Sequence, residues 1–360
     1  MSIKYNGGYI PAVGADGTTL VANSSASTGV AWTAGTVQSN PVLNSAFQVW
    51  QRGISISLAA STGTATYTAD RWCATTSPAQ ATTVSRQATG DTTNLPNIQY
   101  ALRYQRNAGQ TGTAGANLVN NFESINSIPF AGKTVTLSFY ARAGANYSAS
   151  GSILTGLLIS GTGTDQNLFT GLTGQTTVIA NPATLTTTWQ RFSLSGSVAS
   201  NVTQLVVTMN SGASGTAGAA DYYELTGVQI DIGSVALPFR TNAPTLSGEL
   251  AACQRYYQRY TVGALYGYFP MTGFATSTTV ITEQTIAPVV MRVSPNSIEY
   301  GGAFQTLGGG NLIVGTITNA CDTGNLLRVN CAVTGAVSGL FYQISSNNNI
   351  NSYLAWSAEL

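Results

Sequence analysis

The segment Thr134-Val135-Thr136-Leu137-Ser138-Phe139 alternates hydroxyl-bearing and apolar side chains without a break. Successive side chains of a β-strand point to opposite faces, so this alternation predicts a strand with one polar and one buried face. The period of two returns at Leu205, Val207 and Met209. Clusters of turn-forming residues separate these runs, with no helical period between them. The sequence therefore predicts a β-sandwich or jelly roll over residues 41–243.

One of the predicted strands changes phase in its middle. Tyr223 and Leu225 share one phase, whereas Val228, Ile230 and Ile232 share the opposite phase. An extra residue in a strand produces such a shift, and glycine is favoured there. The Thr226-Gly227 dipeptide is therefore predicted to form a β-bulge.

Residues 1–40 are rich in Gly, Ser, Thr and Ala and hold few large apolar side chains. A segment of this composition does not bury a core of its own. We expect an extended arm that docks on a partner, because a simple linker would not need large apolar side chains. The anchors expected in this arm are Tyr9, Ile10, Leu20, Val30 and Trp32.

A helix is predicted over 244–261, between two β-domains. Ser247 is the expected N-cap, and Glu249 lies in the first turn, where a carboxylate favours a helix. Apolar and aromatic residues then recur at helical spacing. The tyrosines Tyr256, Tyr257 and Tyr260 are expected to pack at a trimer axis or at the junction between domains.

Residues 262–360 return to period two and predict a C-terminal β-domain. The pattern predicts strands around Val289–Val293 and Leu327–Val333. The last residues, Leu354, Trp356, Ala358 and Leu360, share one phase and predict a buried closing strand. The expected fold is all-β: an N-terminal arm, a jelly-roll sandwich, a short bridging helix and a C-terminal domain resembling a β-sandwich.

The composition excludes several classes of function. The chain has no histidine, and only 8% of its residues are charged, so Ser-His-Asp, Cys-His and His-zinc chemistry are absent. A net charge of +1 provides no field to attract nucleic acid. No run of 18 apolar residues predicts a membrane span, and the N-terminus lacks the layout of a signal peptide. We expect a non-enzymatic protein made in a cytoplasm, which reaches the outside by another route such as a virion.

The four cysteines show no metal-binding spacing. Cys73, Cys253, Cys321 and Cys331 form no CxxC pair. Cys321 and Cys331 flank a turn, so either a disulfide or two small core side chains fits the pattern.

Several segments resemble bacteriophage tail-fibre proteins. The stretch from Asn40 to Gly53, followed by Tyr67–Trp72, resembles the opening of a carbohydrate-binding-like jelly roll found in such fibres, and Glu224–Gly233 resembles its last strand. The segments 14–23, 28–32, 249–257 and 357–360 are similar to fibre leaders and C-terminal regions. The resemblance covers about a quarter of the chain, and its specificity lies in the order of the segments.

The resemblance implies a virion-exposed structural protein, a homotrimeric tail fibre that adheres to a host-surface glycan. Its residues 1–40 would dock on other virion proteins. A capsid decoration protein or head fibre anchored by this arm is the main alternative, followed by a tailspike polysaccharide depolymerase and a secreted carbohydrate-binding module. Related modules often hold a structural calcium through an acidic residue at the position of Gln48, which leaves Asp221, Glu224 and Asp231 as the remaining oxygen ligands here. We expect no other cofactor.

Two clusters are candidates for contact with a ligand. Tyr100, Arg103, Tyr104 and Arg106 combine the residue types that recognition surfaces enrich, and they form the candidate glycan site. The same pattern fits a strand with one solvated face. Asp70-Arg71-Trp72 also suggests a sugar-stacking site, but we expect Trp72 to fill the core and Asp70 to pair with Arg71 or cap a turn.

Overall fold

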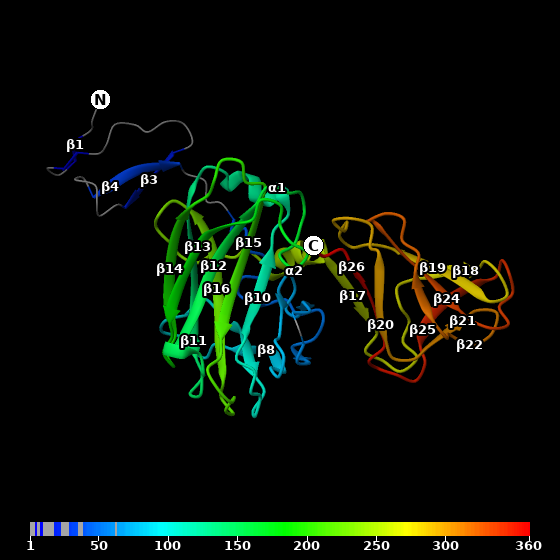
Figure 1. Cartoon of the computed structure of the whole chain (residues 1–360). Coiled ribbons are helices and arrows are strands. Elements are labelled where there is room, and N and C mark those ends of the chain that lie inside the picture. The colour runs from blue at the N-terminus through cyan, green and yellow to red at the C-terminus, as the bar shows by residue number, and fades with distance from the viewer. Residues whose placement is uncertain (1–3, 6–7, 10–17, 23–28, 35–38, 62) are drawn as a thin grey trace. The chain divides into compact units, whose positions relative to one another are not determined.

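The computed structural model describes residues 4–5, 8–9, 18–22, 29–34, 39–61 and 63–360 (Figure 1). The chain divides into two compact units, Met1–Ser39 and Asn40–Leu360. In the first unit, β1 (Lys4–Tyr5) pairs with β2 (Gly8–Tyr9), and β3 (Thr18–Ala22) pairs with β4 (Val30–Ala34).

The second unit begins with a β-sandwich of two six-stranded antiparallel sheets. The order in one sheet is β13-β12-β15-β10-β7-β6, and in the other β14-β11-β16-β9-β8-β5. The strands are β5 (Ser55–Leu58), β6 (Thr66–Tyr67), β7 (Cys73–Ala74), β8 (Thr82–Ala88), β9 (Tyr100–Arg106), β10 (Gly115–Asn121), β11 (Thr134–Ala143), β12 (Ile153–Gly161), β13 (Thr176–Thr184), β14 (Gln190–Ser197), β15 (Gln204–Gly212) and β16 (Tyr222–Ile232).

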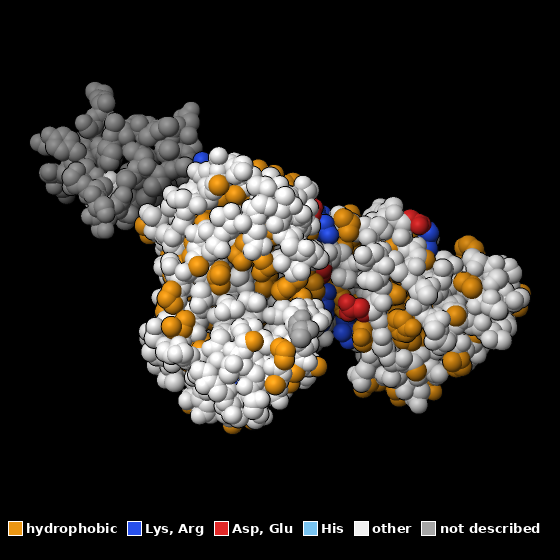
Figure 2. All heavy atoms as spheres, viewed as in Figure 1, with side chains coloured by type: hydrophobic (Ala, Val, Ile, Leu, Met, Phe, Trp, Pro, Cys, Tyr) orange, Lys and Arg blue, Asp and Glu red, His pale blue; other side chains and the backbone are white. Residues whose placement is uncertain are grey.

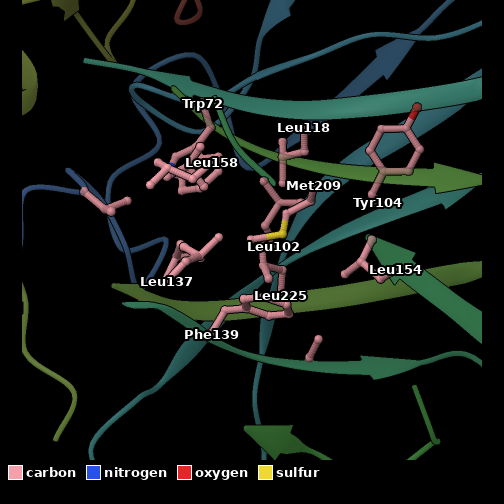
Figure 3. Close-up of a cluster of buried hydrophobic side chains, with 14 of the residues drawn as sticks. Trp72, Leu102, Tyr104, Leu118, Leu137, Phe139, Leu154, Leu158, Met209 and Leu225 are labelled. Atoms are coloured by element: carbon pink, nitrogen blue, oxygen red, sulfur yellow. The ribbon is translucent and has the colours of Figure 1, made fainter. Parts of the chain in front are cut away.

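Apolar side chains from both sheets meet in one core (Figure 3). Leu137 and Phe139 of β11 are fully buried there, and so are Leu118 and Met209 of the facing sheet. Interdigitated side chains of this kind close a sandwich, because each sheet covers the apolar face of the other. The strands predicted from alternating residues around Leu137 and Val207 are confirmed.

The predicted bulge in β16 is also confirmed. The register between β11 and β16 shifts between Ser138 and Tyr140, opposite Gly227. The φ of Gly227 is +59°, and a Cβ there would lie 2.8 Å from the Tyr140 ring. Only glycine fits both restrictions, so this position fixes the change of phase.

Short helices connect the strands of the second unit. They are α1 (Ser124–Ser127), the 3₁₀ helices Ile128–Phe130 and Ser150–Ser152, and α2 (Leu246–Gln254). The N-cap of α2 is Thr245, whose hydroxyl accepts a hydrogen bond from Gly248 N at 3.1 Å, so the prediction of Ser247 was wrong. No helix among the described residues has the length and hydropathy needed to cross a membrane.

The C-terminal part contains a three-stranded sheet, β17-β26-β20, and a seven-stranded sheet, β22-β21-β25-β18-β19-β24-β23. Its strands are β17 (Tyr257–Thr261), β18 (Thr272–Ala275), β19 (Val280–Ile286), β20 (Ser297–Gly301), β21 (Phe304–Leu307), β22 (Leu312–Ile313), β23 (Ile317–Asn319), β24 (Leu326–Ala332), β25 (Phe341–Ser346) and β26 (Tyr353–Ser357). The closing strand is confirmed: β26 is the central strand of its sheet, and Leu354 and Trp356 are fully buried. The all-β expectation is therefore confirmed.

Two local predictions need correction, and the alternative left open for two cysteines is decided. The helix predicted over 244–261 ends at Gln254, and Tyr257–Thr261 is a strand, because it pairs with β26. Residues 289–293 form no strand: Pro288 and Pro295 flank the segment, and Met291 N donates to Gly324 O instead of to a sheet. The cysteines at 321 and 331 are free thiols, and Cys321 Sγ accepts a hydrogen bond from Arg328 N.

Candidate functional site

The structure divides the four residues of the candidate glycan site on β9 between different environments. Tyr104 is buried in the core, stacks on Tyr223 with ring centroids 5.4 Å apart, and donates to Thr75 O. Burial raises the pKa of Tyr104 to about 12. Arg106 is also buried, pairs with Asp221 at 2.7 Å, and donates to the carbonyls of three loop residues. These two side chains stabilise the sandwich.

Arg103 belongs to a row of charges across three strands. Glu224 of β16 is fully buried and pairs with Arg103 of β9 and Arg142 of β11, each at 2.6 Å. The Arg103 guanidinium also lies 3.9 Å from the centroid of the Tyr222 ring. Tyr100 is half-buried, with Arg86 over its ring. The four residues predicted on β9 do not form one recognition surface, because buried and half-exposed side chains alternate along the strand.

The tyrosines after α2 lie where the sandwich meets the C-terminal sheets. Tyr256 is buried with the Arg71 guanidinium 3.5 Å from its ring centroid. Tyr257 lies under Arg52 at 3.5 Å and donates its hydroxyl to Glu299. Tyr260 packs edge-on against Trp356.

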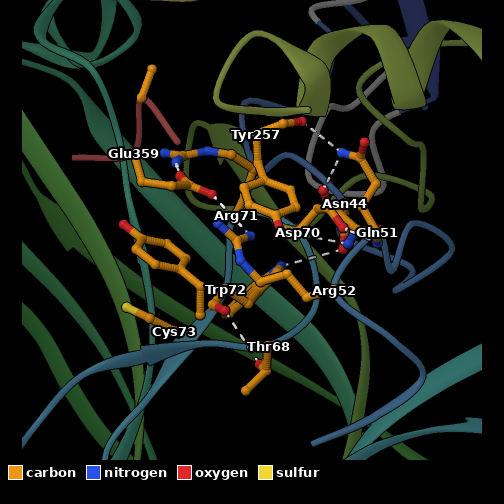
Figure 4. Close-up of polar contacts among 12 residues, drawn as sticks. Asn44, Gln51, Arg52, Thr68, Asp70, Arg71, Trp72, Cys73, Tyr257 and Glu359 are labelled. Carbon is orange, nitrogen blue, oxygen red and sulfur yellow. Dashed lines mark hydrogen bonds and ion pairs between the residues drawn. The ribbon is translucent and has the colours of Figure 1, made fainter. Parts of the chain in front are cut away.

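The Asp70-Arg71-Trp72 motif is structural (Figure 4). Trp72 is fully buried in the sandwich core, as expected. Asp70 does not pair with Arg71. It accepts hydrogen bonds from the backbone and side-chain nitrogens of Gln51, whereas Arg71 forms a buried ion pair with Glu359. Figure 2 shows that charged side chains on the visible face gather near this boundary between sandwich and C-terminal sheets.

The acidic residues considered for calcium are all paired with arginines. Asp221 pairs with Arg106, Glu224 with two arginines, and Asp231 with Arg240. Among the described residues, no three acidic or cysteine side chains gather in a way that could hold a metal ion.

The arm residues fall in the first unit. Tyr9 lies in β2, Leu20 in β3, and Val30 and Trp32 in β4, where Leu20 faces Trp32 in the strand register. Ile10 lies outside the described residues. Their docking role stays a prediction.

A hollow on the seven-stranded sheet is a site that the sequence analysis did not find. It has a volume of about 680 Å³ and lies over β18, β19, β24 and β25. Phe274 of β18 and Phe341 of β25 are directly paired across the two strands and are 57% and 59% exposed. Two neighbouring phenylalanines are seldom left exposed on the face of a sheet, because burying an aromatic ring is strongly favourable.

Polar side chains complete the hollow. The lining residues are Thr272, Gly273, Phe274, Thr276, Thr282, Gln284, Arg328, Gly339 and Phe341. They offer aromatic faces, hydroxyls, one amide and one guanidinium, and this described lining contains no carboxylate or thiol. The site can therefore bind a ligand through stacking and hydrogen bonds, but it lacks the acid pair that glycoside hydrolysis requires.

A buried carboxyl group lies behind the hollow. Glu283 of β19 is opposite Gly273 of β18 and is fully buried. A Cβ on Gly273 would lie 1.8 Å from Thr282 O, so the strands approach closely here. Glu283 Oε2 accepts a hydrogen bond from Ile344 N of β25 at 2.9 Å, and burial raises the pKa of Glu283 to about 8. The side chain thus connects β19 to β25 across β18.

The hollow was hard to predict because its aromatic pair is far apart in the sequence. Phe274 and Phe341 come together only through the pairing of β18 with β25. A period of two puts Thr272 and Phe274, and likewise Thr282 and Gln284, on single faces of their strands, but it does not show which face is left uncovered.

No protein-family model matches this sequence, and no curated protein sequence matches it. Solved structures show distant similarity. The enzymatically active domain of tailspike protein 4 from bacteriophage CBA120 is 14% identical, with a TM-score of 0.34, over 54% of this chain and 21% of that chain. A putative sugar binding protein from Bacteroides thetaiotaomicron VPI-5482 is 13% identical, with a TM-score of 0.34, over 54% of this chain and 100% of that chain.

The CBM22-2 xylan-binding domain of Paenibacillus barcinonensis Xyn10C is also similar, at 13% identity and a TM-score of 0.30, over 45% of this chain and 92% of that chain. The chain thus resembles, distantly, β-sandwich domains of the carbohydrate-binding-module type and one tailspike domain. The chain spans about a fifth of that tailspike structure. At these identities and TM-scores, the similarities carry no conclusion about function.

Proposed function

We propose that this protein is a trimeric virion fibre protein that adheres to a host-surface glycan without catalysis. The observation that carries the proposal is the hollow on the seven-stranded sheet, with Phe274 and Phe341 exposed side by side. The resemblance of the segments 40–53 and 67–72 to phage fibres supports the virion location.

The chemistry of the hollow suits a sugar. The faces of pyranose rings carry C–H groups that pack on aromatic rings, while their rims carry hydroxyls. Thr272, Thr282 and Gln284 supply hydroxyl and amide groups beside the two phenylalanines. Sites of a few hundred cubic ångströms with aromatic walls and a few polar groups are typical of small-ligand recognition. Three copies in a fibre would convert weak binding at each hollow into avidity.

A glycan array probed with the full chain tests this function. We expect wild type to bind a subset of bacterial polysaccharides. Phe274→Ala and Phe341→Ala should each weaken binding by about tenfold, which is about 1.4 kcal/mol. Ile125→Ala is the matched control, because Ile125 is 72% exposed on α1, outside the residues that line the hollow. Binding that survives the double phenylalanine substitution, or no binding to any glycan, would contradict the proposal.

A second candidate is a capsid decoration protein or head fibre. The separate unit Met1–Ser39 favours it, because an anchoring segment need not share the core of the outer domains. Electron cryo-microscopy of the virion distinguishes the two: density at the tail supports the fibre, and density rooted on the capsid lattice supports decoration.

A further inference from the structure

One charged side chain reaches the hollow. Among the described residues that line it, Arg328 of β24 is the only one with a charge. Its Nε donates to Gln284 Oε1 at 3.3 Å, and its Nη1 pairs with Asp322 at 2.5 Å. No hydrogen bond involves its Nη2 within the described part of the chain. A guanidinium has five N–H donors, so Arg328 keeps donors for a ligand.

Asp322, the ionic partner of Arg328, does not place its negative charge inside the hollow. Asp322 is 69% exposed and is not among the lining residues. An ion pair this exposed is weak, because water solvates both groups. The sequence contains no charged residue over 260–282 or 329–358, so few other charges compete near the four strands. Glu283, which lies between the lining residues Thr282 and Gln284 in the sequence, is fully buried.

The strand register fixes how many strands separate Arg328 from the aromatic pair. Phe274 faces Thr282 of β19, and Gln284 of β19 faces Arg328 of β24. The backbones of Arg328 and Phe274 are therefore two strands apart, about 10 Å across the sheet. The Arg328 side chain reaches back over β19, where its Nε donates to Gln284 Oε1, so a ligand that lies on the phenylalanines can extend along the hollow to the guanidinium.

Resting on the proposed function, we propose that the hollow selects an acidic saccharide. One sugar ring lies on Phe274 and Phe341, and the carboxylate of a neighbouring uronic or sialic acid unit accepts hydrogen bonds from Arg328. Hydrogen bonds between a guanidinium and a carboxylate are charge-assisted and stronger than those to a neutral hydroxyl. The aromatic pair supplies affinity for the saccharide, and Arg328 supplies the preference for acid.

Matched pairs of polysaccharides test this selectivity. Polygalacturonate, polyglucuronate and polysialate are immobilised, each beside its carboxyl-reduced, neutral form. We expect wild type to bind at least one acidic form about tenfold more tightly than its reduced form. Arg328→Gln should lower binding of the acid to the level of the reduced form and leave the reduced form unaffected. Arg86→Gln is the control: Arg86 stacks on Tyr100 of the sandwich, so its loss should change binding to neither the acidic nor the reduced polysaccharide.

The outcomes separate this inference from the function on which it rests. Equal binding to acidic and reduced forms, or an unchanged preference in Arg328→Gln, overturns the acidic selectivity. Binding to neutral glycans that still depends on Phe274 and Phe341 leaves the adhesion function standing. If wild type binds none of the acidic probes, the selectivity is overturned, and the glycan array decides the function. A melting temperature that matches wild type shows that Arg328→Gln is folded.

Discussion

At the scale of single residues, Glu283 is a buried acid of the C-terminal sheets whose protonation depends on burial. Its ordinary pKa of 4.5 is raised to about 8 because burial disfavours the charged carboxylate, although the hydrogen bond from Ile344 N opposes this rise. Among the residues that the structure describes, its second oxygen, Oε1, has no hydrogen-bond partner. Glu283 is therefore mainly protonated and uncharged in the folded protein at neutral pH.

The stability of the protein should fall as the pH rises from 4.5 to about 8. In this window the folded protein keeps the proton on Glu283, whereas the unfolded chain has released it. Because the folded state binds more protons, its free energy of unfolding decreases with pH, by up to about 1.4 kcal/mol per pH unit. Glu283→Gln, which cannot ionise and still accepts from Ile344 N, should remove this slope. Urea unfolding of both proteins at pH 5, 7 and 9 measures how the free energy of unfolding changes with pH. The same pH dependence in wild type and Glu283→Gln would contradict the raised pKa of Glu283.

At the scale of elements, the two candidate caps of α2 give a paired test. The Thr245 hydroxyl accepts a hydrogen bond from Gly248 N and so caps the N-terminus of α2, whereas Ser247, which the sequence favoured, lies inside the helix. Thr245→Ala should cost about 1 kcal/mol, the usual effect of losing an N-cap. Ser247→Ala should change stability by less than about 0.5 kcal/mol. The free energies of unfolding of the two variants measure this difference, and a larger cost at Ser247 would reverse the assignment.

Sequence patterns predicted elements well where burial alternates and poorly where tertiary pairing decides. The run around Leu137 is a strand because every second side chain faces the core, and the phase change at Gly227 marks a real bulge. Tyr257 and Tyr260 have helical spacing from Leu250, yet they form a strand because β26, nearly a hundred residues later, supplies the hydrogen bonds. The hollow escaped prediction for the same reason, since Phe341 is brought to Phe274 by non-local pairing.

At the scale of the whole second unit, buried charge joins the sandwich to the C-terminal sheets. Arg71 of the sandwich pairs with Glu359, stacks on Tyr256, and donates to Asn121 O at 2.6 Å. Arg292 donates to the carbonyls of Ala358 and Glu359. The Arg71–Glu359 pair connects residues that are 288 positions apart in the sequence, and Arg292 helps to hold the segment that carries Glu359. We therefore infer that the sandwich and the C-terminal sheets unfold together.

Removing one partner of the buried pair should separate the two parts. Glu359→Gln leaves the guanidinium of Arg71, 2% exposed, without its ionic partner, and this should cost about 3 kcal/mol or more. Calorimetry should then resolve two transitions in place of one, because the coupling between sandwich and C-terminal sheets is weakened. Asp322→Asn is the control: its pair with Arg328 is exposed, so its loss should change stability by about 1 kcal/mol or less and keep one transition. If Glu359→Gln also melts in one transition at the wild-type temperature, the ion pair does not carry the cooperativity, and the contacts that remain between the two parts, such as those of Arg52 with Tyr257 and of Arg255 with Glu123, would carry it.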